Sequence, residues 1–293
     1  MGVDNGFRFG VNMLSTGSRD VWIEKCRRAE ALGYDVVGVP DHLGMSAPFP
    51  AMMLAAEATE RVRVNTFVLN VPFYNPVLLA RDVATVDGLS GGRVELGLGA
   101  GYVEDEFAAA GIAFPSGGRR VESVREAAAT LRRLYADPDY QPQPAQAGGP
   151  PLLIAGWGER MLRVAAEHAD IIALTGAATA ASGVLTLADA AEAADRVAYL
   201  RELLGARADS TEVNVLIQAL IEPHERDEAL QLLAPHLPAT GAADLDDFIA
   251  LLVGTPEQMA ERLRERRKTH GINYITVLEH NMDKLAAVID LVR

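Results

Sequence analysis

The alternation of short apolar runs with longer amphipathic stretches is the feature that most constrains the fold of this chain. Eight runs suited to buried strands are separated by segments whose apolar residues recur with helical spacing. Strands that alternate with helices in this way predict a parallel sheet in which the helices are the crossovers. The expected strands are Phe7 to Val11, Asp35 to Val39, Val62 to Leu69, Arg93 to Leu98, Pro151 to Ala155, Asp170 to Leu174, Glu212 to Ile221 and Ile272 to Leu278.

The expected helices follow from apolar spacing and from their terminal residues. Proline suits the first turn of a helix, as at Pro76, and Thr255 followed by Pro256 and Glu257 has the residues of a helix start. The proline-rich segment from Asp137 to Pro151 is interpreted as a connector within one domain. The predicted helices are Arg19 to Leu32, Pro50 to Glu57, Pro76 to Leu89, Arg119 to Tyr135, Gly158 to Ala169, Thr186 to Leu204, Asp227 to His236, Leu245 to Val253, one beginning at Thr255, and Met282 to Leu291.

Eight strand and helix units without a change in composition predict a single-domain α/β fold, a (β/α)8 TIM barrel over residues 1–293. A doubly wound sheet is the alternative fold. The glycine run of residues 97–101 lacks the spacing of a dinucleotide-binding loop, and it follows the fourth strand. The barrel is therefore the preferred fold, and its functional residues are expected where strands end and helices begin.

Composition limits the partners. A formal net charge of −13 repels nucleic acid and anionic membranes, and no apolar run reaches the length of a membrane span, so we expect a small-molecule ligand. Cys26 is the only cysteine, which excludes an intrachain disulfide and a cysteine-based zinc site. This cysteine usage indicates a cytoplasmic protein.

The residues after the predicted strands offer little chemistry of their own. The three lysines fall in helices, which argues against a Schiff-base mechanism. His168, His236 and His270 also lie on helices or at their ends, and only His42 and His280 are well placed, so no metal site is expected. Glycines at residues 97–101 and 156–158 would let a flat ligand or a phosphate approach the backbone, although a tight turn explains each of them too. The barrel is thus expected to hold a cofactor that carries the reactivity.

Several motifs together resemble the luciferase-like monooxygenase family, specifically its branch of coenzyme F420-dependent oxidoreductases, over essentially the whole chain. They occupy residues 29–35, 40–43, 75–81, 89–102 and 254–257. The resemblance implies a barrel with F420 at its mouth, which exchanges a hydride at the deazaflavin C5 carbon with a small organic substrate.

The resemblance also implies roles for individual residues. Asp41 and His42 match a pair beside the deazaflavin ring, and His42 and Glu106 are the expected catalytic residues. Phe67 and Val68 match a non-proline cis peptide behind the ring. The plain alternatives are a loop cap for Asp41, packing for His42, Phe67 and Val68, and a first-turn helix acid for Glu106.

Further cofactor contacts are implied in three loops. Ala100 and Gly101 match residues that run along the cofactor, the turn Gly156, Trp157 and Gly158 matches its phosphate site, and Thr175 matches a hydroxyl near that phosphate. Tyr102, also expected at the cofactor, replaces a tryptophan or an acid of relatives, which argues against glucose 6-phosphate as the substrate. Trp157 is bulkier than usual, and we expect it to stack on a ligand or partly close the phosphate site.

Two other functions remain open from the sequence. An FMN-dependent monooxygenase of the same fold would need a flavin reductase as partner, and a non-catalytic barrel could bind cofactor without turnover. The resemblance further implies a homodimer that forms through helices covering the second to fourth strands.

Overall fold

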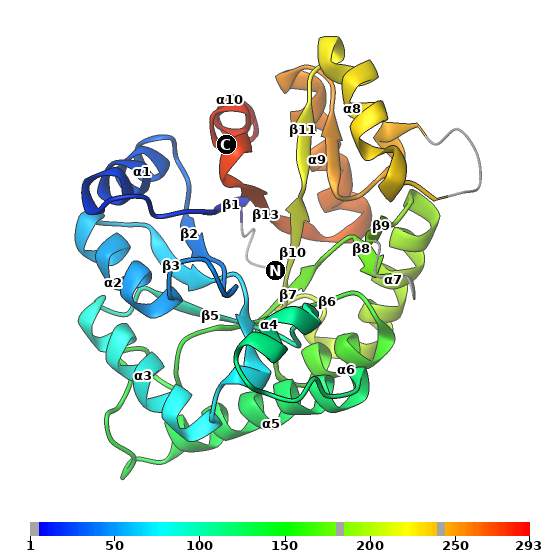
Figure 1. Cartoon of the computed structure of the whole chain (residues 1–293). Coiled ribbons are helices and arrows are strands. Elements are labelled where there is room, and N and C mark those ends of the chain that lie inside the picture. The colour runs from blue at the N-terminus through cyan, green and yellow to red at the C-terminus, as the bar shows by residue number, and fades with distance from the viewer. Residues whose placement is uncertain (1–5, 180–184, 239–243) are drawn as a thin grey trace.

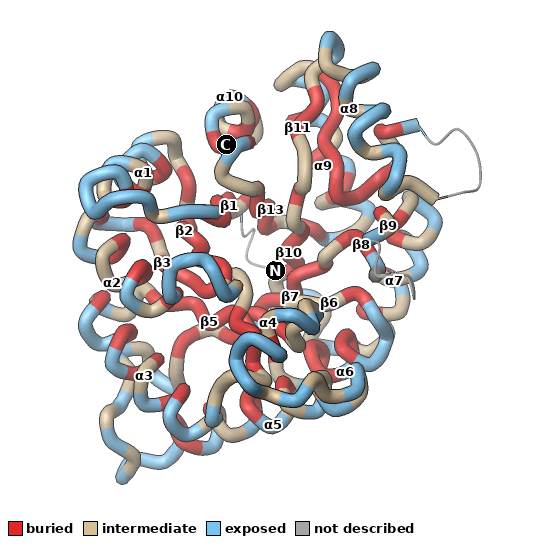
Figure 2. The backbone as a smooth tube through the Cα atoms, viewed as in Figure 1, coloured by how far each residue is buried: buried red, intermediate tan, exposed pale blue. Residues whose placement is uncertain are grey.

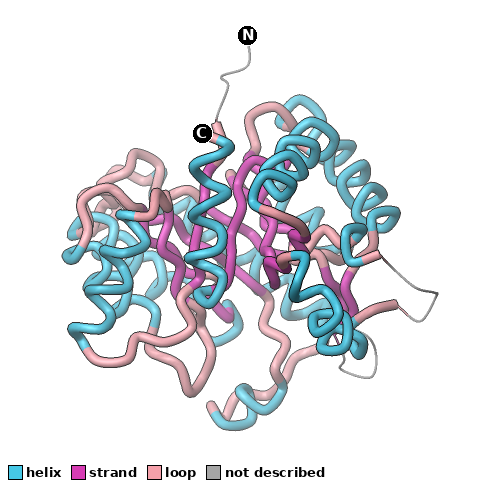
Figure 3. Tube along the Cα trace, turned by 90° about the horizontal axis from the view of Figure 1, so that it is seen from above, coloured by secondary structure: helices cyan, strands magenta, loops and turns pink. Residues whose placement is uncertain are grey.

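The computed structural model describes residues 6–179, 185–238 and 244–293. Its main sheet closes into a parallel barrel. β3, at one end of the strand order, pairs with its neighbour β2 and also with β5 near the other end. The order around the barrel is β3, β2, β1, β13, β10, β7, β6, β5, with β4 continuing β3 beside β5. Helices surround the central strands (Figure 1), and the view from above shows them packed around the sheet (Figure 3). The predicted barrel is confirmed.

The elements have the following bounds. The strands are β1 Arg8–Asn12, β2 Val36–Val39, β3 Arg63–Thr66, β4 Leu69–Asn70, β5 Val94–Gly99, β6 Leu152–Gly156, β7 Ile171–Leu174, β8 Ala177–Thr179, β9 Leu185–Leu187, β10 Glu212–Ile217, β11 Ala219–Ile221, β12 Leu251–Val253 and β13 Ile272–Leu278. The α-helices are α1 Arg19–Ala31, α2 Pro48–Ala58, α3 Pro76–Leu89, α4 Glu104–Ala109, α5 Gly117–Ala136, α6 Glu159–His168, α7 Ala190–Leu204, α8 Arg226–Leu233, α9 Pro256–His270 and α10 Met282–Val292. Short 3-10 turns are η1 Val71–Phe73, η2 Gly205–Arg207, η3 Pro223–Glu225, η4 Ala234–His236, η5 Leu245–Asp247 and η6 Glu279–Asn281.

Side-chain alternation along the strands divides the barrel wall into two faces. In β5, Val94, Leu96 and Leu98 belong to the large apolar core between strands and helices. The residues between them, Glu95 and Gly97, face the barrel interior. Figure 2 shows buried backbone along the strands and exposed backbone on the outer helix surfaces. Aliphatic packing against helices therefore occupies one face, and the interior holds polar residues together with a smaller apolar cluster.

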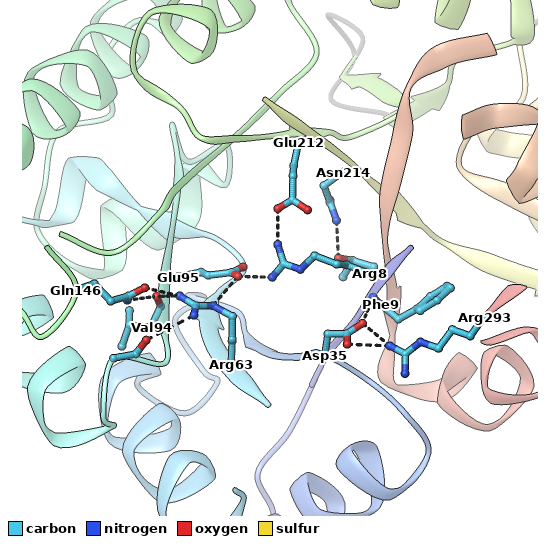
Figure 4. Close-up of polar contacts among 12 residues, drawn as sticks. Arg8, Phe9, Asp35, Arg63, Val94, Glu95, Gln146, Glu212, Asn214 and Arg293 are labelled. Carbon is cyan, nitrogen blue, oxygen red and sulfur yellow. Dashed lines mark hydrogen bonds and ion pairs between the residues drawn. The ribbon is translucent and has the colours of Figure 1, made fainter. Parts of the chain in front are cut away.

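An ion-pair cluster fills the amino-terminal end of the barrel. Arg8 pairs with Glu95 and Glu212, and the Nε of Arg63 lies 2.8 Å from Glu95 Oε1. Figure 4 shows these side chains converging from four strands, and the Arg8 guanidinium carbon also lies 4.6 Å from the Tyr274 ring centroid. Burial raises the pKa of Glu212, while attraction to Arg8 opposes that rise. Because this end is filled, the carboxyl ends of the strands are where a ligand can enter.

Arg93 and Glu30, from the motifs at residues 89–102 and 29–35, stabilise connections between elements. The Arg93 guanidinium donates to the carbonyls of Ala56, Thr59 and Val62, which joins the end of α2 to β5. The Glu30 carboxylate accepts backbone N–H groups of residues 60–62, at distances of 2.6 to 3.2 Å. Both contacts hold the βα units together at the amino-terminal ends of β3 and β5, away from the carboxyl ends of the strands.

The predicted helix from Leu245 to Val253 is wrong. This segment is a 3-10 turn, η5, followed by β12, which pairs in parallel with β11 in a small separate sheet. Phe248 and Leu251 are buried in a second apolar cluster with Ile221 and Leu187. Residues 248–253 are apolar throughout, and so short a run has no diagnostic period, so the available partner strand decided its structure.

Two other predicted elements were too long. The helix expected from Thr186 begins only at Ala190, where Asp189 is the N-cap, and β9 before it pairs antiparallel with β8. The strand expected from Glu212 to Ile221 is interrupted at Gln218, whose N–H donates to Ala250 O at 2.8 Å. None of the helices within the described ranges has the length and hydrophobicity that a membrane span requires.

Candidate active site

His42 and Glu106 meet at the carboxyl-terminal mouth of the barrel. His42 follows β2, and Glu106 lies in the first turn of α4, after β5. His42 Nδ1 lies 2.7 Å from Glu106 Oε1, and their side chains are 32% and 13% exposed. The Tyr102 ring stands edge-on to the imidazole, with 5.9 Å between centroids. The loops after β2 and β5 thus bring together an imidazole, a carboxylate and a phenol.

Asp41 joins the loop after β2 to the end of β4. One carboxylate oxygen, Oδ2, accepts both the Asn70 backbone N–H at 2.9 Å and the Tyr74 hydroxyl at 3.0 Å. Burial raises the pKa of Asp41, while these two hydrogen bonds and the nearby His42 oppose the rise. Asp41 therefore holds the loop that carries His42, which agrees with the capping alternative for this residue.

The peptide bond between Phe67 and Val68 is cis, which confirms the expectation for that position. Both side chains are partly exposed and pack, with Ala155, on the apolar cluster of the barrel interior. They form an apolar floor at the mouth. An aromatic ring system could lie against this floor, so the side chains present fit a flat cofactor.

The glycines in and just after β5 make room for neighbouring parts of the protein. A Cβ at Gly97 would lie 2.0 Å from Thr66 O, and one at Gly99 would lie 2.6 Å from Val68 Cγ2. Gly101 has φ 67°, and a Cβ there would lie 2.1 Å from Asn70 Oδ1. Close packing against these neighbours therefore explains the glycines, and the expected contact of Ala100 and Gly101 with a cofactor stays a prediction.

Two residues expected near the cofactor lie next to these glycines. Ala100, just after β5, is partly buried against the main core. Tyr102 is 67% exposed, so its ring is available to a ligand. Arg120 Nε donates to Gly101 O at 3.0 Å, which fixes the backbone between them.

The turn after β6 is only partly as expected. A Cβ at Gly156 would lie 2.3 Å from Met161 Cγ, so this glycine serves helix packing, whereas Gly158 at the start of α6 has open space around it. Trp157 is 5% exposed, and its indole Nε1 donates to Glu192 Oε1 at 2.7 Å. Because the ring is buried against α7, the Trp157 side chain has little surface left on which a ligand could stack, and its expected part at the phosphate site stays a prediction. Its neighbour in the next loop, Thr175, donates its hydroxyl to Ala177 O at 3.1 Å.

Tyr74 and Glu192 take part in these networks but were not expected from the sequence. Tyr74 contacts Asp41 from the segment after β4, next to Asn70 at the end of β4, and Glu192 contacts Trp157 from α7. Neither Tyr74 nor Glu192 lies in a pattern that would have singled it out. Across the described ranges there is no group of His, Cys, Asp and Glu that could hold a metal ion. His280, the other histidine expected to be well placed, has its Nε2 3.1 Å from Asn281 Nδ2.

The fold and site define a class: a (β/α)8 barrel with an apolar floor and an imidazole–carboxylate pair at its mouth. A family model described as luciferase-like monooxygenase matches residues 7–273, and the chain belongs to that family.

Individual relatives agree with this assignment. The chain is 39% identical over 128 residues to a protein named F420-dependent glucose-6-phosphate dehydrogenase from Amycolatopsis mediterranei, a match covering 41% of this chain and 38% of that protein. It is similar in fold to an F420-dependent secondary alcohol dehydrogenase, with TM-score 0.74 and 21% identity, over 98% of this chain and 99% of that one. It is also similar to a coenzyme F420-dependent tetrahydromethanopterin reductase from Methanopyrus kandleri, with TM-score 0.78 and 18% identity, over 98% and 100%. The chain thus spans about two fifths of the length of the named dehydrogenase.

Proposed function

We propose that this protein is a coenzyme F420-dependent oxidoreductase, which transfers a hydride between the deazaflavin and a small organic substrate. The observation that carries the proposal is the 2.7 Å contact between His42 and Glu106 at the barrel mouth. The relatives support the choice of cofactor, since the names of the dehydrogenase and of both structures include F420.

The proposed cofactor site uses the apolar floor and the adjoining loops. Phe67 and Val68 would support the ring system, with Ala100, Gly101 and Tyr102 along its edge. The start of α6 would receive the phosphate, because helix amino termini offer unpaired N–H groups and a positive dipole end. Open space at Gly158 suits this role, the Thr175 hydroxyl lies in the next loop, and Trp157 and Gly156 would contribute backbone only.

When bound, F420 supplies the carbon that accepts or donates the hydride. A proton must move together with the hydride when an alcohol is oxidised or a carbonyl is reduced. With Nδ1–H donated to Glu106, His42 keeps a lone pair on Nε2, where it can take that proton from the substrate oxygen. The Glu106 carboxylate stabilises the imidazolium that results and fixes the ring orientation. Glu106 is therefore a positioning residue, and His42 is the proton acceptor or, in the reverse direction, the donor.

The first experiment is a titration of the purified protein with F420 and, separately, with FMN, followed by cofactor fluorescence. Binding of F420 is expected. Binding of FMN with no response to F420 would contradict the proposal and favour an FMN-dependent monooxygenase with a reductase partner.

The second experiment is the His42→Ala variant. Turnover, measured as the change in F420 absorbance with a panel of alcohols and ketones, should fall by about 10²- to 10⁴-fold, since a positioned acid or base contributes that much. Binding of F420 should persist. Unchanged turnover would remove His42 from the mechanism, and F420 binding without turnover in the wild-type protein would favour a non-catalytic barrel.

We further propose that residues 1–293 form one domain and that the protein is a homodimer. The outward face of α3 supports the dimer, because Val77, Leu78 and Leu89 on it are 50%, 52% and 70% exposed. This helix covers the strands that the resemblance places at the dimer interface. The cytoplasmic location stays a prediction.

A further inference from the structure

Apolar side chains are exposed along one arc of the barrel mouth. Leu14 follows β1, Leu43 and Met45 follow β2, and Tyr102 follows β5; they are 36%, 50%, 43% and 67% exposed, respectively. These four residues are called the apolar rim below. Strands β1 and β2 are neighbours in the barrel, and β3 alone separates β2 from β5. The rim therefore follows the strand order around part of the mouth.

Contacts between the loops join the rim into one surface. Thr16 Oγ1 lies 2.7 Å from Ser46 Oγ, which ties the loop after β1 to the loop after β2. Leu14 and Met45 line the same small pocket, together with the apolar side chains of Met13, Trp22, Val39 and Pro40.

The rim adjoins the imidazole–carboxylate pair. The N–H of Met45 donates to His42 O at 3.0 Å, in the same loop as Leu43. The Tyr102 ring centroid lies 5.9 Å from that of the imidazole. A molecule held by the rim would thus lie next to the group that moves the proton.

The charges near the rim disfavour an anionic substrate. The carboxylates of Asp41, Glu106 and Glu279 all lie in segments that follow strands at this end of the barrel. Lys25 pairs with Glu279, whose other oxygen accepts the Leu14 N–H at 2.8 Å. Arg120 donates to the carbonyls of Gly101 and Pro115. These two cations are already engaged with the protein.

We propose that the apolar rim binds the body of an uncharged, predominantly apolar substrate, with its polar reacting group at His42. Exposed apolar side chains beside a few convergent polar groups are typical of a small-molecule site. The assignment of the bound molecule as a substrate rests on the proposed function. Binding at the rim does not depend on the cofactor's identity.

The test uses 2-octanone as an apolar probe and glucose 6-phosphate as an anionic probe. Each is titrated calorimetrically into the full-length protein, with and without saturating F420. The variants are Leu43→Ser and Met45→Ser, with Leu232→Ser as the matched control, because Leu232 is an apolar residue on α8 that is 76% exposed.

The wild-type protein should bind 2-octanone more tightly than glucose 6-phosphate. Each rim variant should bind 2-octanone about tenfold more weakly, since burying a leucine or methionine side chain contributes enough for such a change. The control should bind it as the wild type does. Tighter binding of glucose 6-phosphate, no binding of 2-octanone, or rim variants that match the control would each overturn the proposal. The expected 2-octanone pattern without any F420 binding would instead contradict the proposed function and leave the rim intact.

Discussion

Asp41 shows how burial changes the behaviour of a side chain at the barrel mouth. Burial raises its pKa, so the folded protein holds this proton more tightly than the unfolded chain does. The stability that protonated Asp41 contributes is present below the ordinary carboxyl pKa of about 3.9 and is lost as pH rises through the higher pKa of the folded state.

The Asp41→Asn variant tests whether the contribution of Asp41 to stability decreases as pH rises. An amide keeps an oxygen that can accept from Asn70 and Tyr74, but it does not ionise. The unfolding free energy of the wild type minus that of the variant should therefore decrease as pH rises across this range. Urea unfolding at a series of pH values measures the difference. A difference that increases with pH, or one that is constant, would show that burial does not dominate at this site.

Cys26 is expected to be chemically inert in the folded protein. It is 0% exposed, and burial raises the pKa of its thiol to about 12. The reactive thiolate is therefore scarce at neutral pH, and reagents have no access to it. Iodoacetamide should leave the native protein unmodified and alkylate Cys26 fully in urea, as followed by intact mass. Rapid alkylation of the native protein would refute this expectation.

Some residue-level features could be predicted and others could not. The motifs singled out His42 and Glu106, but their contact joins residues 64 positions apart, and no local pattern encodes that distance. For Trp157, the direction of the side chain could not be predicted from the sequence. Its size suggested a ligand contact, yet a carboxylate on α7 accepts its indole N–H and the ring is buried. The direction of a side chain depends on neighbours that are remote in sequence.

At the scale of elements, the glycines of β5 are explained by the segment that connects β3 to β4. A Cβ at Gly97 would lie 2.0 Å from the Thr66 carbonyl oxygen, a backbone atom that cannot rotate away. We therefore expect Gly97→Ala to destabilise the protein by about 3 kcal/mol or more, because overpacking a buried site costs on the order of 1 to 3 kcal/mol even where side chains can adjust.

Gly88→Ala is the matched control for this prediction. Gly88 lies within α3, and its Cβ would meet nothing within 4 Å. Alanine should stabilise the helix by up to about 1 kcal/mol there. Urea or thermal unfolding compares the two variants. Equal stability of Gly97→Ala and Gly88→Ala would show that the backbone near Thr66 adjusts at little cost.

Elements with clear end signals were predicted well. The helix expected from Pro76 to Leu89 is α3 with the same bounds, and the Asn75 side chain caps it. Thr255 forms a capping box with Gln258 at the start of α9. The segment from Leu245 to Val253 is an exception. Asp244 caps its start and Gly254 follows it, yet it became a turn and a strand because β11 was available as a partner.

At the scale of the whole molecule, the alternation of strands and helices was enough to predict the barrel. It did not reveal the second apolar cluster, where β11 and β12 pack with Phe248 and Leu245 beside the main core. That cluster depends on contacts between loops that follow different strands. Such loops lack the periodicity that marks the barrel strands.

The proposed homodimer gives a prediction at this scale. The Leu78→Asp variant places a charge on the exposed apolar face of α3, where burial against a second copy would require its desolvation. The wild type should be a dimer by light scattering coupled to size exclusion, and the variant should shift toward monomer. Leu232→Asp on α8 is the control and should remain dimeric. A monomeric wild type, or a dimeric Leu78→Asp variant, would exclude this interface.

The sequence by itself determined which segments form the strands and helices of the barrel, because apolar period, caps and prolines act within a few residues of one another. It also marked the loops that hold the candidate site. Only the tertiary structure decided how those loops meet: that His42 contacts Glu106, that Asp41 accepts from Tyr74, and that Gly97 makes room for Thr66. These contacts join residues that are distant in sequence, and closure of the barrel is what brings them within reach.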